Sequence, residues 1–338
     1  MNRYCKIWLY RCAGVIASVL FNSGTIKAQL QSGLTGVPDT SFSNHSAFKS
    51  ALKKYPQIKF PVTDTLVNVK NKLGVAYATF EKRKLLLDAF YSKQKSNSGI
   101  AVIIIHGGGW RSGNRTQHYA LAQQLAAKGY TCFTPEYRLS TEALFPAAVY
   151  DLKAAIRWVR ENAARYNIDT GKIAVAGFSA GGELAAFLAT TGNMPLFEGT
   201  AVAPKTPSHV NALIDIDGTL SFVHTESSEM TDTSKRIGAS AQWMGYTLRE
   251  DFALWQAASP LSHVNKNTPP ALFLNSSVAR MHAGRDDFNK ILTKYNIYTE
   301  VQTFENSPHT FCLFEPWFTP TVNCIDTFLK KVFKNNTQ

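Results

Sequence analysis

The sequence predicts an α/β domain built on a mostly parallel central sheet of about eight strands, with helices on both faces. Short apolar runs alternate with segments of helical periodicity along most of the chain. The run at 100–105 is unbroken, which is typical of a strand buried on both faces. The chain has 338 residues, 45% hydrophobic and 18% charged, so it can form a large core.

Strand-like segments occur throughout the chain, and we expect the first two to be antiparallel to each other. In chain order they are 66–69, 85–90, 100–105, 130–134, 173–176, 210–216, 271–275 and 298–304. Helical periodicity is found at 117–128, 146–166, 184–188, 286–295 and 322–333. The helix at 146–166 is the clearest, because Val149, Leu152, Ile156 and Val159 fall on one stripe.

The N-terminal residues 1–28 have the pattern of a cleaved secretion signal, with a basic start, an apolar run and a cleavage point after Ala28. We therefore expect a secreted or periplasmic protein. Polar residues 29–60 are interpreted as an N-terminal arm, and 61–338 as the α/β domain itself. The long stretch at 218–264 is expected to be a cap-like insertion with helices of its own.

Charge and cysteine content narrow the range of partners. The net charge of +12 favours an anionic partner, although no basic helix or arginine-rich run suggests nucleic acid. The apolar run of the signal is too short to span a bilayer, so no stable membrane insertion is expected.

Cys312 and Cys324 could pair in an oxidising compartment. No metal-ligand spacing occurs, and we expect neither metal nor cofactor; the oligomeric state is not predicted.

A candidate nucleophile follows the strand at 173–176. The residues Gly-Phe-Ser-Ala-Gly at 177–181 match G-x-S-x-G, and helical spacing resumes directly afterwards. In the order strand, tight turn, helix, this motif lifts a serine hydroxyl clear of the sheet, here that of Ser179. The alternative is a glycine-rich turn that only needs small residues. The flanking strand and helix favour the nucleophile.

A serine needs a base, and oxyanion donors must stabilise the charge that develops on the substrate. His309 follows the last predicted strand, which suits the base, although it could be an ordinary loop histidine. His106 and His282 are weaker candidates. Three glycines follow His106, and we assign the backbone N–H groups of Gly108 and Gly109, with that of Ala180, to the oxyanion hole. A phosphate loop would need Lys and Ser/Thr residues that this loop lacks.

These motifs together resemble the α/β-hydrolase superfamily, in its hormone-sensitive-lipase-like and feruloyl-esterase-like branch. The resemblance covers about residues 65–333 and is carried by HGGGW at 106–110, EYRLS at 136–140, FPAAVYDLKAAIRWVREN at 145–162, GFSAGG at 177–182 and SPHTF at 307–311. It implies the α/β-hydrolase fold and a serine esterase. IDIDG at 214–218 and ARMHAGRDD at 279–287 further resemble secreted polysaccharide esterases of gut Bacteroidetes, some of which act on pectin.

The third member of the catalytic triad is not where the family usually has it. The usual position, just after the strand at 271–275, holds two serines. Asp217, at the end of the preceding strand, is our first candidate, since a carboxylate there can reach the same histidine. Asp286 or Asp287 is the second, and Glu226 the third. Asp217 could instead only form a turn with Gly218, and the pair at 286–287 could only favour a helix N-terminus.

Arg280, His282 and Arg285 lie in the loop that presents the acid in the family, so we expect them at the mouth of the site, where arginine can bind a carboxylate. They could equally form ion pairs with neighbouring aspartates. Trp110 is a candidate for stacking on a sugar ring, although most tryptophans are simply packed.

The sequence therefore predicts a secreted serine carboxylic-ester hydrolase that removes acetyl or methyl esters from an acidic plant polysaccharide such as pectin. A feruloyl or acetyl xylan esterase and a small-ester, lipase-like enzyme are alternatives within the same chemistry. A catalytically inactive, carbohydrate-binding relative is the alternative of another class.

Overall fold

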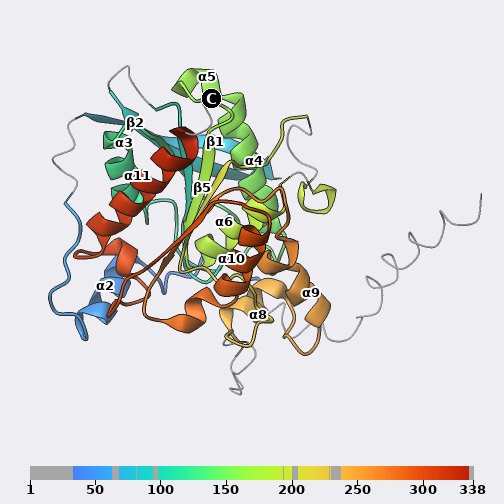
Figure 1. The fold of residues 1–338 in the computed structure, drawn as a ribbon. Helices are drawn as coiled ribbons and strands as arrows, with labels where there is room; N and C mark the ends of the chain where they lie inside the picture. Colours follow the sequence, from blue (N-terminus) through green and yellow to red (C-terminus); the bar gives the residue numbers. More distant parts are fainter. Residues whose placement is uncertain are drawn as a thin grey trace, which may run out of the picture.

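The computed structural model describes residues 33–62, 68–80, 82–93, 98–192, 194–199, 205–227, 229 and 237–334. The expected secretion signal at 1–28 lies outside the described residues. One eight-stranded sheet runs through the molecule in the order β1-β2-β4-β3-β5-β6-β7-β8 (Figure 1). The strands are β1 (Val69–Phe80), β2 (Arg83–Ser92), β3 (Ala101–Ile105), β4 (Thr131–Pro135), β5 (Ile173–Phe178), β6 (Ala212–Ile216), β7 (Ala271–Asn275) and β8 (Thr299–Thr303).

The sheet is mostly parallel, as predicted. Among the described strands, the pairs β1–β2 and β2–β4 alone are antiparallel. The strands from β4 through β3 and β5 to β8 all run in one direction. Such a sheet needs cover on both faces, because its strands are apolar on both sides. The predicted α/β-hydrolase fold is confirmed.

Two hydrophobic cores lie on opposite faces of the sheet. Alternate residues of β3 enter each core: Ile103 and Ile105 point to one, Val102 and Ile104 to the other. The first core packs against α4 (Ala147–Glu161), α6 (Ala180–Thr190) and α10 (Arg285–Lys294). The second packs against α2 (Asn44–Leu52), α3 (Tyr119–Ala127) and α11 (Phe318–Lys334) (Figure 1).

Three segments differ from the sequence prediction. The first strand begins at Val69 rather than ending there, because β1 is an exposed edge strand with almost no apolar run to reveal it. The helix predicted at 146–166 is divided at Asn162 into α4 and the short α5 (Ala163–Tyr166). The final helix begins at Phe318, four residues before the predicted start.

The segment at 218–264 carries two short helices, α8 (Ala239–Met244) and α9 (Phe252–Ala257), and the 3₁₀ turn η3 (Pro260–His263). Trp243 and Trp255, on α8 and α9, are fully buried. The polar segment expected to be an N-terminal arm contains α2, which packs beside α11 and α3 on the second face. Among the residues that the structure describes, no helix is long and apolar enough to cross a membrane.

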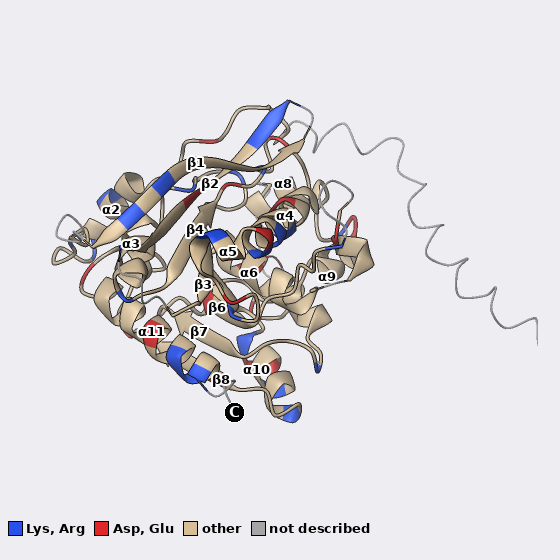
Figure 2. Cartoon of the chain, turned by 90° about the horizontal axis from the view of Figure 1, so that it is seen from above, with Lys and Arg blue, Asp and Glu red and all other residues tan. Residues whose placement is uncertain are grey.

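Positive charge is spread over the surface rather than gathered at one place. Figure 2 shows lysine and arginine residues, in blue, on elements far apart in the fold, including β1, α10 and α11. The formal charge of +12 therefore does not mark one basic groove of the kind that follows a nucleic-acid backbone. In sheets of this kind, the ligand-binding site lies where the loops at the carboxyl ends of the parallel strands meet.

Candidate active site

Ser179 lies on the tight turn between β5 and α6. Its backbone has φ 58° and ψ −123°, a conformation that residues other than glycine rarely adopt. The turn is possible because its flanking residues are glycine: a Cβ on Gly177 would collide with the carbonyl of Gly181, and a Cβ on Gly181 with that of Ile105. The N–H of Ser179 is fixed by the carbonyl of Ile216 at 2.9 Å.

His309 comes to the same place from the loop between β8 and α11. Its Nε2 lies 2.9 Å from the Oγ of Ser179. The ring packs on Phe178, with 4.8 Å between the ring centroids. Nε2 is therefore held within hydrogen-bonding distance of the serine hydroxyl, at a distance that suits proton transfer.

Asp217, at the end of β6, contacts the ring nitrogen of His309 that does not face Ser179. Its Oδ2 lies 2.9 Å from the Nδ1 of His309. Its Oδ1 accepts a hydrogen bond of 2.8 Å from the N–H of Ser276, and the hydroxyl of Ser276 donates to Oδ2. Ser276 occupies the position where the family usually has its acid. The serine therefore supports an acid that comes from the neighbouring strand.

The second candidates for the acid are held elsewhere. Asp286 forms an ion pair with Arg285, with 2.7 Å between Oδ1 and Nη2. Asp287 forms one with Lys290 at 2.8 Å. Both are in the first turn of α10, where a carboxylate is favoured by the helix N-terminus. Neither forms a hydrogen bond with His309, so Asp217 is the one of these three aspartates that has the required contact.

The remaining alternatives also have other contacts. His106 is buried and stacked on Tyr137, and burial lowers its pKa to about 4. Burial also lowers the pKa of His282, and the hydroxyl of Ser179 is hydrogen-bonded to His309 instead. Glu226 accepts a hydrogen bond of 3.0 Å from the N–H of Gly284 and makes none with His309.

The three N–H groups assigned to the oxyanion hole are available. Among the described residues, none of the N–H groups of Gly108, Gly109 and Ala180 donates to a protein acceptor, whereas that of Gly107 is bound to the Oε1 of Gln117 at 2.8 Å. The loop takes this path because Gly108 has φ 124°, and a Cβ there would collide with the backbone of Ser112. Free donors beside a nucleophile are what a developing oxyanion needs.

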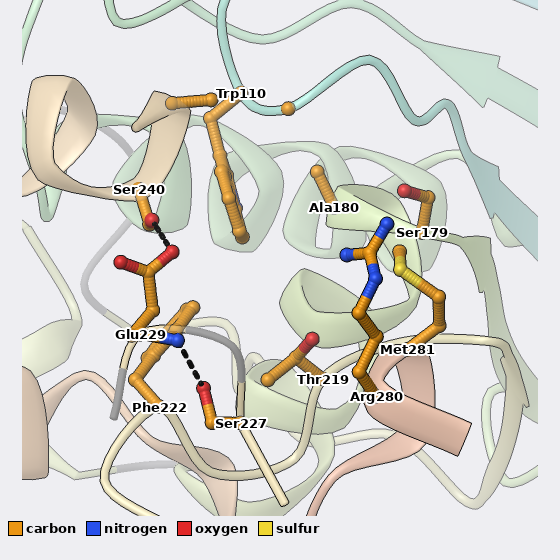
Figure 3. A pocket seen from close by; sticks show the side chains of 12 residues that line it. Trp110, Ser179, Ala180, Thr219, Phe222, Ser227, Glu229, Ser240, Arg280 and Met281 are labelled. Carbon is orange, nitrogen blue, oxygen red and sulfur yellow. Dashed lines mark hydrogen bonds between the residues drawn. The ribbon is translucent and has the colours of Figure 1, made fainter. Parts of the chain in front are cut away.

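A cavity of about 200 Å³ opens between the nucleophile and the segment at 218–264. Trp110 and Phe222 supply its apolar walls. Glu229, held by the hydroxyl of Ser240, lies across the cavity from Arg280 (Figure 3). Ser179, Gly109, Ala180, Thr219 and Met281 are also among its lining residues. The cavity therefore combines apolar walls with charges of both signs.

The structure separates the three loop cations that the sequence groups together. Arg280 is exposed, lines the cavity and has no ion pair among the described residues. Figure 3 shows its guanidinium directed toward Ala180 and Ser179. Arg285 instead donates to the Oδ1 of Asn275 at 2.8 Å and pairs with its neighbour in sequence, so its placement in the substrate site is corrected. His282 is also not among the lining residues.

Trp110 is held by a residue that the sequence did not single out. Its indole N–H donates to the Oε2 of Glu183 at 2.9 Å, and its ring stacks on Trp243 with 4.9 Å between centroids. Glu183 is fully buried in α6, and its Oε1 has no partner among the described residues. Burial raises the pKa of Glu183 well above its ordinary value. An acid within the apolar run of α6 was the signal that could have revealed this contact.

Cys312 and Cys324 are both free, so the disulfide considered from the sequence is not formed. Burial raises the pKa of both thiols, which favours their protonated form. Within the described ranges, no group of His, Cys, Asp and Glu side chains has the arrangement of a metal site.

A family model and two curated relatives relate this chain to esterases. The BD-FAE family model matches residues 87–280. Esterase LipC of Mycobacterium tuberculosis is 29% identical over 263 residues, covering 75% of this chain and 64% of the relative. An arylesterase of Saccharolobus solfataricus is 37% identical over 159 residues, covering 46% of this chain and 52% of the relative. The chain thus spans less than two thirds of the length of these curated relatives.

Solved structures agree in fold. A truncated form of a carbohydrate esterase from gut microbiota has a TM-score of 0.68 at 26% identity, covering 80% of this chain and 100% of that one. An esterase of Thermogutta terrifontis has a TM-score of 0.62 at 23% identity, covering 81% and 96%. At that lower identity the second likeness concerns the fold alone.

The buried carboxyl of Glu183 should make stability depend on pH. Below about pH 4 the group is protonated in both the folded and the unfolded chain. Above that, the unfolded chain loses the proton while the folded chain keeps it, so folding becomes less favourable as the pH rises. Glu183→Gln keeps an acceptor for Trp110 and removes this titration. Urea unfolding from about pH 4 to 8 should show the free energy of unfolding of the wild type falling relative to the variant.

The matched control for this prediction is Glu305→Gln, which changes an exposed carboxyl. Its free energy of unfolding should stay parallel to that of the wild type across the pH range. A Glu183→Gln curve that is also parallel to the wild type would contradict a protonated, buried Glu183.

Proposed function

Because the chain belongs to the BD-FAE family of α/β-hydrolase esterases, we propose that it is a serine carboxylic-ester hydrolase that works through an acyl-enzyme. The observation that carries this proposal is the pair of 2.9 Å contacts that join Asp217 to His309 and His309 to Ser179. They match the order of acid, base and nucleophile that acyl transfer requires. The free N–H groups beside the serine support the same chemistry.

Acylation begins when the Nε2 of His309 accepts the proton of Ser179 and the serine Oγ forms a bond to the ester carbonyl carbon. The carbonyl oxygen becomes an oxyanion and accepts hydrogen bonds from Gly108, Gly109 and Ala180. Asp217 keeps the proton of the imidazole on Nδ1 and stabilises the imidazolium. The C–O bond to the alcohol then breaks, and His309 gives its proton to the departing oxygen.

Deacylation repeats these roles with water. His309 removes a proton from the water, whose oxygen attacks the acyl carbon on Ser179, and the same N–H groups stabilise the second oxyanion. Collapse breaks the bond to Ser179, which recovers its proton from the imidazolium. The carboxylic acid leaves, and the site returns to its starting state without a metal or organic cofactor in any step.

Replacing the acid tests these roles. In Asp217→Asn the amide would place the wrong tautomer of the imidazole next to the serine, and we expect turnover of 4-nitrophenyl acetate to fall by about 10⁴ with little change in KM. The controls Asp286→Asn and Asp287→Asn change the second candidates and should keep wild-type turnover. Strong loss in either control, with Asp217→Asn still active, would exclude the assigned acid.

We further propose that the substrate is an O-acetylated or methyl-esterified acidic plant polysaccharide such as pectin. Similarity to a carbohydrate esterase supports a sugar ester. Arg280, exposed in the cavity without an ion pair among the described residues, supports a carboxylate on that sugar. The net charge of +12 favours approach of an anionic polymer. Such a polymer is met outside the cytoplasm, in agreement with the signal proposed at 1–28.

The products identify the reaction. Wild type and Ser179→Ala should be incubated with acetylated, methyl-esterified pectin and with acetylated xylan, and acetate and methanol measured by mass spectrometry. We expect the wild type to release acetate or methanol from pectin, and the variant neither. Release from xylan alone would show that the substrate is a neutral polysaccharide and would contradict the acidic substrate proposed here. No release from any ester, 4-nitrophenyl acetate included, would favour the inactive, carbohydrate-binding alternative.

Arg280 should determine the preference for acidic substrates. Arg280→Gln removes a charged hydrogen-bond donor, and we expect kcat/KM on acetylated pectic oligomers to fall about tenfold or more. The value on neutral acetylated xylo-oligomers should change little. The loss should be smaller at high salt, because salt screens the wild-type attraction. Arg249→Gln, which alters an exposed arginine outside the cavity, is the matched control. Equal effects of the two variants would contradict a role for Arg280.

A further inference from the structure

A separate cavity, of about 170 Å³, lies where the helices α2, α3 and α11 begin. Its apolar wall is formed by side chains from distant parts of the chain: Phe60, Pro61, Leu121, Leu313 and Phe318. It shares no lining residue with the cavity beside Ser179. We call it the rear cavity.

We propose that the rear cavity binds a small uncharged compound that carries a hydroxyl group on a ring, of about the size of phenol. The proposal does not rest on ester hydrolysis, because no residue assigned to the catalytic triad or to the oxyanion hole lines this cavity. It adds a binding site behind the catalytic centre.

His118 is the first reason to expect a ligand. The residue is 2% exposed, and neither of its ring nitrogens has a hydrogen-bond partner within the described part of the chain. Burial lowers the pKa of His118 to about 3, so at neutral pH the ring has one N–H donor and one acceptor nitrogen. Buried polar atoms are nearly always paired, and unpaired ones cost stability. A ligand group that both donates and accepts would satisfy this ring.

Asn44, the first residue of α2, adds an acceptor to the same wall. Its Nδ2 donates to the carbonyl of Gln117 at 2.8 Å, and this bond fixes the orientation of the amide. Its buried Oδ1 has no partner among the described residues. Gln117 precedes His118 in the sequence, so the two unpaired side chains lie on one side of the cavity. A single hydroxyl can donate to one acceptor and accept from the imidazole N–H.

The lining favours an uncharged ligand. No described residue that lines the rear cavity is an aspartate, glutamate, lysine or arginine, and the hydroxyl of Tyr119 is bound to Asp88. The N-terminus of α3 favours an acceptor atom, which a hydroxyl oxygen supplies. A carboxylate would instead face the Oδ1 of Asn44, with no cationic side chain to offset the loss of its hydration.

The volume sets the size of the ligand. In another protein an apolar cavity of about 150 Å³ holds benzene. The rear cavity, with about 170 Å³, has room for such a ring and one further heavy atom. Phe60 and Phe318 line it and supply aromatic surface. A ring with one hydroxyl therefore fits both the space and the two unpaired side chains.

One aromatic ring separates the rear cavity from the catalytic imidazole. Phe178 meets the ring of His118 edge-on, with 6.0 Å between centroids, and also packs on His309. Gln117, which lines the cavity, holds the N–H of Gly107 in the oxyanion loop. A ligand in the rear cavity would therefore contact residues that support the catalytic site, without lying against Ser179.

Binding can be measured on the full chain with 4-fluorophenol, followed by fluorine NMR. We expect saturable binding to the wild type and equal binding to Ser179→Ala. Fluorobenzene, which lacks the hydroxyl, should bind about fivefold more weakly, because His118 and Asn44 stay unpaired. Absence of saturation by 4-fluorophenol up to about 10 mM, or equal affinity for fluorobenzene, would overturn the proposal.

Methyl NMR locates the ligand. 4-Fluorophenol should shift the methyl signals of Leu121 and Leu313, which line the rear cavity. Ala180 and Met281 line the cavity beside Ser179, and their methyl signals should move less. Shifts confined to Ala180 and Met281 would place the phenol in the catalytic cavity and refute the rear site. 4-Fluorobenzoate should leave Leu121 and Leu313 unshifted, and shifts as large as those with the phenol would contradict an uncharged ligand.

His118→Phe removes both ring nitrogens and keeps an aromatic ring. The preference for 4-fluorophenol over fluorobenzene should fall from about fivefold to nearly none. The matched control His45→Phe changes an exposed residue of α2 outside the cavity and should keep the wild-type preference. An unchanged preference in a folded His118→Phe would count against the role of this histidine and sink the proposal. If the variant does not fold, the ligand series on the wild type decides.

The proposed function and this inference fail in different ways. A protein that binds 4-fluorophenol in the rear cavity but does not hydrolyse 4-nitrophenyl acetate would refute the esterase and leave the binding site. An active esterase whose Leu121 and Leu313 signals do not respond would refute only the binding site.

Discussion

The buried carboxylate of Asp217 is the group on which the geometry of the site depends. The side chain has no exposed surface, and a buried charge is tolerated only where it is paired and hydrogen-bonded. Here the hydroxyl and N–H of Ser276 satisfy it from one side and the imidazole of His309 from the other. The ends of β6 and β7 and the loop after β8 are thereby tied to one carboxylate, and the histidine is aimed at the serine.

A second buried carboxyl, that of Glu183, positions a wall of the cavity and is not part of the catalytic triad. It lies in α6, the helix that follows Ser179, and it accepts a hydrogen bond from the indole of Trp110 in the oxyanion loop. The indole in turn stacks on Trp243 of the segment at 218–264. The nucleophile helix, the oxyanion loop and the insertion are thus connected through one ring. A buried acid lowers stability at neutral pH, so its retention agrees with a role in positioning the wall of the site.

The parts predictable from sequence were those that leave a local pattern. The strands β3, β5, β6 and β7 appear as apolar runs because both their faces are buried, and the motif around Ser179 has the context that its strained turn requires. β1 was misplaced because an exposed edge strand has no such run. Asp217 was the first candidate for the acid, but only the fold shows Ser276 beside it. The separation of Arg280 from Arg285 depends on the direction of each side chain, and the packing of α2 against Phe314 joins distant segments; local periodicity encodes neither.

The arm has a consequence for how the protein is made. Residues 39–60 are synthesised early, yet they pack against Phe314 and pair with Glu315 near the opposite end of the chain. During synthesis, N-terminal segments generally have to wait for distant partners before long-range contacts can form. The packing of the arm beside His309 therefore cannot be completed before residues 314 and 315 are available. A chain shortened before these residues would lack the contacts that hold the arm against the domain.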